Sequence, residues 1–212
     1  MPRRILLVGL ISLALGLIGC WSYREPPANP TRYRLDYADP EIPPLSRLPQ
    51  IVIRVDPFGA PPPLRDERVT FHESRLTTSY YPYHRWISPP PDLVTFYLAR
   101  DLQQSGLFHA VFVFDQQADA THAIRGTLLS FGEEDRPDGW EAVLEVNLAL
   151  IRAQEHDPAQ QVLIQRRYRI TESAPARSPD AVATAMSRAM QRFSAMVAVD
   201  IHQVLDEAAV CR

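Results

Sequence analysis

The chain has 212 residues, 46% of them hydrophobic and 22% charged, which is enough to bury one core and leaves no room for a second catalytic domain. All 22 basic residues are arginine, and the absence of lysine excludes P-loop, kinase-type and Schiff-base lysine chemistry. The formal net charge of −3, with arginines scattered along the chain, disfavours a nucleic-acid partner.

The first twenty residues have the pattern of an exported lipoprotein. A basic start precedes an apolar stretch from Ile5 to Ile18, which is typical of a secretory signal and is short for a membrane-spanning helix. The stretch ends at Leu17-Ile18-Gly19-Cys20, which resembles the bacterial lipobox, whose cysteine carries acyl chains, palmitate among them. We therefore predict a signal peptide over residues 1–19 and a lipidated Cys20 that anchors the chain to a membrane. The alternative is an uncleaved signal anchor with Cys20 as an ordinary thiol.

Residues 20–32 form a candidate spacer between the lipid and the body of the protein. Their prolines favour an extended backbone, so the body, residues 33–212, can stand up to about 37 Å from the membrane. Once Cys20 is lipidated, Cys211 is the only cysteine with a free thiol. The chain therefore cannot form an intramolecular disulfide. Because Trp21 follows Cys20, where an aspartate favours inner-membrane retention in enteric bacteria, we infer the periplasmic face of the outer membrane.

The sequence of the N-terminal half of the body predicts five strands and one helix. Alternating or β-branched residues indicate the first four strands at residues 33–37, 50–56, 68–72 and 76–81. The helix has Ser88 as its cap and Pro89 in its opening turn, and it ends at Ser105-Gly106. Its apolar face carries Leu93, Phe96, Tyr97 and Leu102. The nearly continuous apolar run from Phe108 to Phe114 indicates a strand that is buried on both faces.

Three longer strands and a long helix follow. The strands are predicted at residues 121–132, 139–152 and 161–171, joined as antiparallel hairpins by turns at 133–138 and 154–160. In the second strand, the alternation predicts a core-facing stripe of Ala142, Leu144, Val146, Leu148 and Leu150. Ser178-Pro179-Asp180 starts a helix of about thirty residues. Its apolar face comprises Val182, Met186, Met190, Phe193, Val197, Ile201, Val204 and Ala208. The predicted fold is one α/β domain: a mixed, largely antiparallel sheet with two main helices packed on it, the longer one C-terminal.

The sequence offers little support for catalysis. The six histidines show no paired ligand spacing, no cysteine pair accompanies them and no serine lies in a GxSxG context. We therefore expect no metal, no cofactor and no enzymatic activity. Glu133-Glu134-Asp135 could pair carboxylates for acid–base work, but we expect a solvated turn. Arg166, Arg167 and Arg169 could meet anionic lipid headgroups, but we expect a solvated strand face.

The segment from Tyr80 to Pro90, with Ser105 to Val111 after the first helix, resembles the auxiliary lipoprotein family of ABC-type transporters, the paraquat-inducible protein C-like family. In that family an aromatic stretch leads to a tryptophan, a nearby proline and a helix. The helix ends in a turn with glycine and phenylalanine, and a valine-rich strand follows. The resemblance also includes the early strands, the Ala118-Asp119 turn and the last helix.

The resemblance implies a non-enzymatic periplasmic component of an intermembrane lipid transport system. Its implied partners are a mammalian-cell-entry-domain protein, a permease and an ATPase, which the lipoprotein meets at the outer membrane, with a homo-oligomeric ring as one arrangement. Tyr81, Tyr83 and Trp86 are candidate partner-binding residues, because tyrosine and tryptophan are enriched in interface hot spots. The alternative role of this aromatic group is to pack the corner between strand and helix.

Two other classes of function stay open from the sequence. An independent lipid carrier needs an apolar cavity lined by the sheet and the long helix. A lipid-anchored hydrolase needs a serine and a histidine that folding brings within hydrogen-bond reach.

Overall fold

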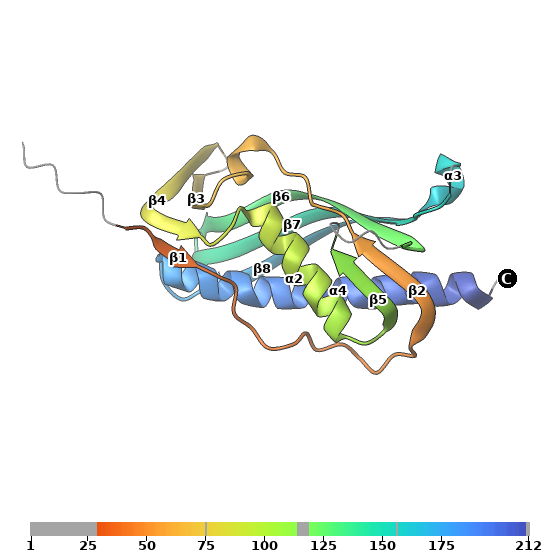
Figure 1. The fold of residues 1–212 in the computed structure, drawn as a ribbon. Coiled ribbons are helices and arrows are strands. Elements are labelled where there is room, and N and C mark those ends of the chain that lie inside the picture. Colours follow the sequence, from red (N-terminus) through yellow and green to blue (C-terminus); the bar gives the residue numbers. More distant parts are fainter. Residues whose placement is uncertain (1–28, 75, 114–118, 156, 211–212) are drawn as a thin grey trace, which may run out of the picture.

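The computed structural model describes residues 29–74, 76–113, 119–155 and 157–210 (Figure 1). The predicted signal peptide, Cys20, most of the predicted tether and Cys211 lie outside these ranges. None of the helices in the described part of the chain is both long and apolar enough to cross a membrane.

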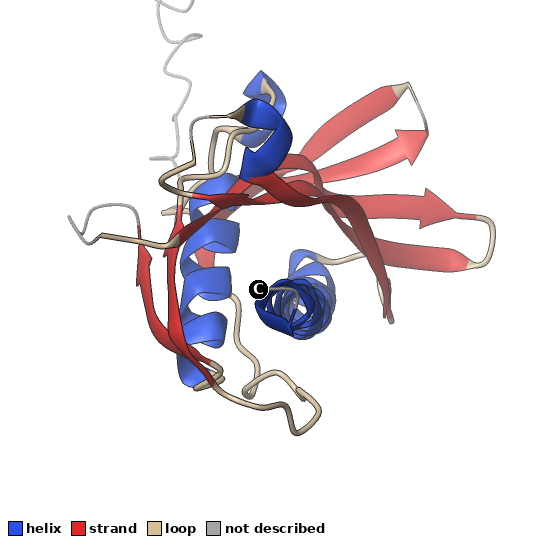
Figure 2. Cartoon of the chain, turned by 90° about the vertical axis from the view of Figure 1, so that its right-hand side faces the viewer, coloured by secondary structure: helices blue, strands red, loops and turns tan. Residues whose placement is uncertain are grey.

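The described residues form one mixed sheet of eight strands that curves around the long C-terminal helix (Figure 2). The strands are β1 (Thr31–Tyr33), β2 (Leu48–Val55), β3 (Arg68–Ser74), β4 (Thr77–Trp86), β5 (Phe108–Val113), β6 (His122–Arg136), β7 (Gly139–Arg152) and β8 (Val162–Ala174). The helices are α2 (Pro90–Gln104), α3 (Pro158–Gln161) and α4 (Pro179–Val210), with a 3-10 turn at Pro62–Leu64. The predicted α/β domain with the longer helix at its C-terminal end is confirmed.

The strand order along the main path is β1-β4-β3-β6-β2-β5, and β7 and β8 extend from β6. The long ladders β6–β7 and β7–β8 are antiparallel, as is β3–β4, whereas the shorter contacts β1–β4, β2–β5, β2–β6 and β3–β6 are parallel. Helices α2 and α4 both lie on the concave side, where α4 contacts β7 and β8 and α2 contacts β5 (Figure 2).

The β6–β7 hairpin is longer than predicted. Strand β6 continues to Arg136, so the turn is reduced to Pro137 and Asp138. Glu133 pairs with Ala142 in the ladder, which means that the predicted solvated turn at Glu133 is wrong. The predicted inward stripe of β7 is confirmed, since each of its five residues is at most 1% exposed: Ala142, Leu144, Val146, Leu148 and Leu150.

The predicted strand at residues 33–37 is displaced. Strand β1 ends at Tyr33, and residues 34–47 have no regular structure. The Tyr97 hydroxyl donates a hydrogen bond of 2.6 Å to the Leu35 carbonyl, and the Tyr37 hydroxyl donates one of 2.8 Å to Asp101. The alternation in this segment therefore reflects side chains that pack on helix α2, because an extended chain can alternate without a neighbouring strand.

Helix α2 differs from the prediction at its start. Pro89 is the N-cap, and no side chain caps the helix, so Ser88 is not the cap. Prolines at the first helical positions lack the N–H groups that a cap would satisfy, which removes the need for one. The predicted end is confirmed, with Gly106 at φ +65°. Phe96 is 57% exposed, so it does not belong to the buried face that the other three predicted residues form.

Strand β5 lies at the end of the strand path and, among the described residues, pairs with β2. Phe108 and Val111 are buried, while His109 is exposed. Ala110, Phe112 and Val113 are half-buried, so the strand is only partly buried and the predicted full burial of both faces is wrong. Phe114 lies outside the described residues.

Helix α4 begins as predicted, with the Ser178 hydroxyl accepting the Ala181 N–H at 3.2 Å. Six residues of its predicted apolar face have no exposed surface: Val182, Met186, Met190, Phe193, Val197 and Ile201. In the next turn Leu205 is buried, whereas Val204 is half-buried. At about 1.5 Å per residue, the 32 residues of the helix reach about 48 Å along the sheet.

Candidate partner-binding surface

The three predicted partner-binding residues lie on β4, but the structure gives them different environments. Trp86 has no exposed surface, and its ring packs edge-on against Phe131 with centroids 5.1 Å apart. It fills the corner between β4 and α2, which is the alternative role considered for this group. A partner cannot contact Trp86 in this conformation.

Tyr81 is half-buried and faces the body of the protein. Its ring lies 4.8 Å from that of Phe71, and its hydroxyl donates a 3.0 Å hydrogen bond to Glu133 Oε2. Burial, and next the adjacent Glu133 carboxylate, raise the pKa of Tyr81. The hydroxyl therefore stays protonated and serves as a structural donor.

Tyr83 is the candidate that reaches solvent. Its side chain is 58% exposed, and its φ of +61° places it in the left-handed region. The register explains this conformation: Thr70 faces Tyr80 and Arg68 faces Arg85, so four residues of β4 bulge opposite one residue of β3. A bulky residue in this region costs about 1–3 kcal/mol, and such strain is found mainly at functional positions.

Three further apolar side chains are exposed on the same hairpin or next to it. Leu76 at the tip is 98% exposed, Ile87 after the end of β4 is 51% exposed, and Tyr80 is 48% exposed. The Arg68 guanidinium lies over the Tyr80 ring, 4.9 Å from its centroid. We name these three residues together with Tyr83 the hairpin surface. Its members combine large contact area with few rotatable bonds, which suits an interface anchor.

A charge cluster around the buried Glu133 supports the base of this hairpin. Arg177, in the loop before α4, lies 3.6 Å from Glu73, 3.6 Å from Glu133 and 3.4 Å from Asp135. Its guanidinium also stacks on the Phe71 ring at 4.8 Å. Desolvation by burial raises the pKa of Glu133. The cluster joins β3, β6 and the start of α4, and no sequence signal pointed to Arg177.

The three arginines of β8 are exposed but ion-paired. Arg169 bonds Glu145 at 2.7 Å and Glu134 at 2.9 Å, and Arg167 also pairs with Glu145. Arg166 lies 2.5 Å from Asp200 of α4. The expected solvated face therefore carries an ion-pair network. Because each guanidinium already has a carboxylate partner, the network is not a ready site for anionic headgroups.

The serine–histidine pair that lies within hydrogen-bond reach in the described part of the chain does not form a hydrolytic site. Ser46 Oγ lies 3.4 Å from His202 Nε2, but the same nitrogen is 2.7 Å from the Ser46 carbonyl oxygen. A carbonyl can only accept, so Nε2 must carry the proton and cannot act as base toward the hydroxyl. Within the described ranges, no group of three or more metal-ligating side chains comes together.

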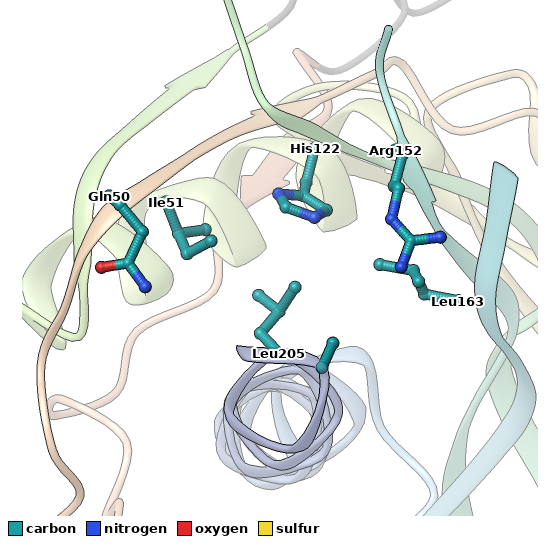
Figure 3. A pocket seen from close by; sticks show the side chains of 7 residues that line it. Gln50, Ile51, His122, Arg152, Leu163 and Leu205 are labelled. Atoms are coloured by element: carbon teal, nitrogen blue, oxygen red, sulfur yellow. The ribbon is translucent and has the colours of Figure 1, made fainter. Parts of the chain in front are cut away.

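A cavity lies where the sheet meets the last turns of α4, as a lipid carrier requires (Figure 3). Its volume is about 230 Å³, and Ile51, Leu163 and Leu205 form much of its wall. Pockets that enclose a small ligand measure roughly 300–1,000 Å³. This compartment by itself is therefore too small to enclose a complete phospholipid.

A family model described as the ABC-type transport auxiliary lipoprotein component matches residues 33–198 of this chain. The match covers strands β2 to β8 and α4 as far as Ala198. Comparison with curated proteins gives no significant match.

Two solved structures have a similar fold. Protein XCC0632 from Xanthomonas campestris, described as a DUF330 protein, has a TM-score of 0.75 at 16% identity over 84% of this chain and 98% of that chain. An uncharacterized protein has a TM-score of 0.63 at 18% identity over 82% of this chain and 99% of that chain. At these identities the similarity shows a shared fold.

Proposed function

The chain belongs to the family of ABC-type transport auxiliary lipoprotein components, and we propose that it is a lipid-anchored docking subunit that performs no chemistry itself. The observation that carries the proposal is the hairpin surface, where a strained backbone presents Tyr83 to solvent. The hydrogen bond between His202 Nε2 and the Ser46 carbonyl counts against a hydrolase, and the ion pairing of the β8 arginines counts against direct binding of headgroups there.

The position of the tether supports docking close to a membrane. Strand β1 pairs with β4, with Tyr33 beside Trp86, so the chain enters the body next to the hairpin surface (Figure 1). The body thus has the hairpin at its N-terminal end and the end of α4 far from it (Figure 1). We propose that acyl chains on Cys20 hold this end at the periplasmic face of the outer membrane.

We propose intermembrane lipid transport as the process and a mammalian-cell-entry-domain protein as the direct partner. A permease and an ATPase would complete the system. The ATPase would supply the energy, because this lysine-free chain has no P-loop with which to bind and hydrolyse ATP. Several copies arranged as a ring would offer the hairpin surface repeatedly to one partner assembly.

The test is the substitution Tyr83→Gly in the full-length chain. Glycine adopts a φ of +61° without strain, so the fold stays intact and the unfolding free energy changes by no more than about 1 kcal/mol. Loss of a hot-spot aromatic weakens binding by about 2 kcal/mol or more, roughly thirtyfold. We expect co-purification of the mammalian-cell-entry-domain protein from membranes, followed by mass spectrometry, to fall accordingly.

Met196→Ala is the matched control, because Met196 is an exposed apolar residue on α4, outside the hairpin surface. It should leave co-purification unchanged. Equal recovery of the partner with Tyr83→Gly and with the wild type would reject the hairpin surface as the docking site. Absence of this partner from wild-type membranes would reject the transport assignment.

A further inference from the structure

We propose that the cavity at the C-terminal end of α4 binds an amphiphile with a single acyl chain and an anionic head, either a carboxylate or a phosphate. Its wall includes Leu205 and Ala208 in the last turns of α4, and Figure 1 shows this end of α4 far from β3 and β4. The site does not depend on the docking role. The apolar part of the wall comes from Ile51 of β2, Leu163 of β8, and Leu205 and Ala208 of α4.

Two irregularities of the sheet shape this cavity. Between Leu48 and Val52, strand β2 places three residues opposite one residue of β5, and Gln50 and Ile51 belong to this bulge. In the β7–β8 ladder, Leu150 faces Ile164 and Ile151 faces Val162, so Leu163 is an extra residue. Bulges re-aim side chains and are enriched beside functional sites. Here the bulged segments of two separate strands supply wall residues to one cavity.

Arg152, the last residue of β7, provides the charge at the cavity wall. Figure 3 shows its guanidinium beside Leu163 and above the last turns of α4, where Leu205 points up toward the cavity. Nη1 donates a 2.5 Å hydrogen bond to the Gln160 carbonyl, and among the described residues no carboxylate forms an ion pair with Arg152. The β8 arginines, by contrast, are each paired with an acid. The guanidinium keeps donors available for an anion.

A more polar hollow of about 470 Å³ adjoins the apolar cavity and shares four wall residues with it: Gln50, Ile51, His122 and Arg152. Thr121, Gln154 and Glu155 complete its wall. Glu155 is the one acid there, and its carboxylate accepts the Asp157 N–H at 3.0 Å. The aliphatic side chains of the cavity wall and the additional polar side chains of the hollow thus meet at Arg152. This arrangement matches an amphiphile whose head contacts Arg152 while part of its acyl chain lies against Leu163 and Leu205.

The size of the site determines how much of the ligand is enclosed. The apolar compartment measures about 230 Å³, so it accommodates part of one chain and not the two chains of a phospholipid. The rest of the chain lies in the hollow or in solvent.

The test uses full-length protein in phosphatidylcholine nanodiscs and three photoactivatable probes with the same diazirine-labelled acyl chain. The heads are a free carboxylate, a lysophosphatidylglycerol and an uncharged monoacylglycerol. Trypsin cleaves this lysine-free chain after arginine, so the peptide from Phe193 to the C-terminus contains Leu205 and is the same in all variants described below. We expect the anionic probes to label this peptide. Labelling by one of them alone would identify the head as carboxylate or phosphate.

The variant Arg152→Gln should reduce labelling by the anionic probes about tenfold, the effect of losing one charge-assisted hydrogen bond. Arg125→Gln is the matched control, since Arg125 lies on β6 near His122 but outside the cavity wall. A second variant, Leu163→Trp, fills the apolar compartment and should abolish labelling. Melting temperatures close to that of the wild type would show that both variants fold.

Three results would overturn the proposal. These are equal labelling of wild type and Arg152→Gln, equal labelling by the uncharged probe, and the absence of label from the Leu205 peptide.

Discussion

Glu133 shows at the scale of single residues how the fold changes the chemistry of a side chain. It has no exposed surface, and its closest cation, Arg177, lies 3.6 Å away. A carboxylate in such a place loses its hydrogen bonds to water, and the hydrogen bond from the Tyr81 hydroxyl replaces only part of them. Desolvation therefore raises the pKa of Glu133 above its ordinary value.

The raised pKa of Glu133 predicts a pH dependence of stability. Between the ordinary glutamate pKa and the raised folded value, the native state holds the proton that the unfolded chain has released, so stability falls as pH rises through this window. Glutamine does not titrate. Relative to wild type, Glu133→Gln should therefore gain stability with rising pH, measured by thermal unfolding between about pH 4 and pH 8.

The control for this experiment is Glu41→Gln, because Glu41 is an exposed carboxyl group outside the cluster. Its stability difference from wild type should not show the same rise. A difference between Glu133→Gln and wild type that stays constant over the whole pH range would contradict the buried, proton-binding carboxyl group described here.

At the scale of elements, α4 is the principal support of the sheet. Its buried face runs from Val182 to Leu205 and packs on β7 and β8. Tyr168 of β8 stacks edge-on against Phe193 at 5.4 Å and donates a 2.7 Å hydrogen bond to Asp200. The helix and the ladder are thus joined by apolar contact and by polar bonds at its edge.

The variant Val197→Asp tests this interface. Val197 has no exposed surface, so an aspartate there is an unpaired buried charge, and we expect it to lower the free energy of unfolding by more than about 3 kcal/mol. Thermal unfolding should show a melting temperature lower by about 6 °C or more. Val204→Asp is the matched control: Val204 is half-buried, and the cost should stay near 1 kcal/mol. Similar melting temperatures for the two variants would mean that the buried face is misassigned.

At the scale of the whole molecule, the two candidate sites occupy opposite ends of the sheet. The hairpin surface lies beside the point where the tether enters, and the cavity lies at the end of α4 (Figure 1). An anchor on Cys20 would hold the first site near the membrane and place the second farther from it. The length and stiffness of the tether then set the distance at which a partner meets the body.

The variant Cys20→Ala tests the anchor. Without the thiol the chain cannot be acylated, so we expect soluble periplasmic protein or uncleaved precursor in cell fractionation. Cys211→Ala changes the other cysteine of the chain and should leave the protein in the membrane fraction. A processed Cys20→Ala protein that still partitions with membranes would refute the lipid anchor.

Much of the fold was predictable because its patterns are local. The stripe of β7 and the face of α4 repeat with the periods of a strand and a helix, and the structure confirms both stripes from Ala142 to Leu150 and from Val182 to Ile201. The errors occur where distant segments meet. Residues 34–37 pack on α2, β6 extends because β7 continues to pair with it, and β5 is only partly buried.

The candidate sites were less accessible to prediction. The sequence drew attention to Tyr81, Tyr83 and Trp86 as a group, but only folding separates an exposed Tyr83 from a buried Trp86. The bulge that produces this difference depends on the register between β3 and β4. Arg177 gave no signal, because its carboxylate partners lie on β3 and β6, far away in sequence. Arg152 gave none, because the rest of its cavity wall comes from β2, β6, β8 and α4.

The sequence by itself determined the α/β class, the two helices and the family resemblance, since these follow from residue types at short, regular spacings. The tertiary structure decided which aromatic side chain reaches solvent, which carboxyl group is buried and where a cavity opens. Those properties depend on contacts between residues distant in the chain, and hydrophobic periodicity holds no information about such contacts.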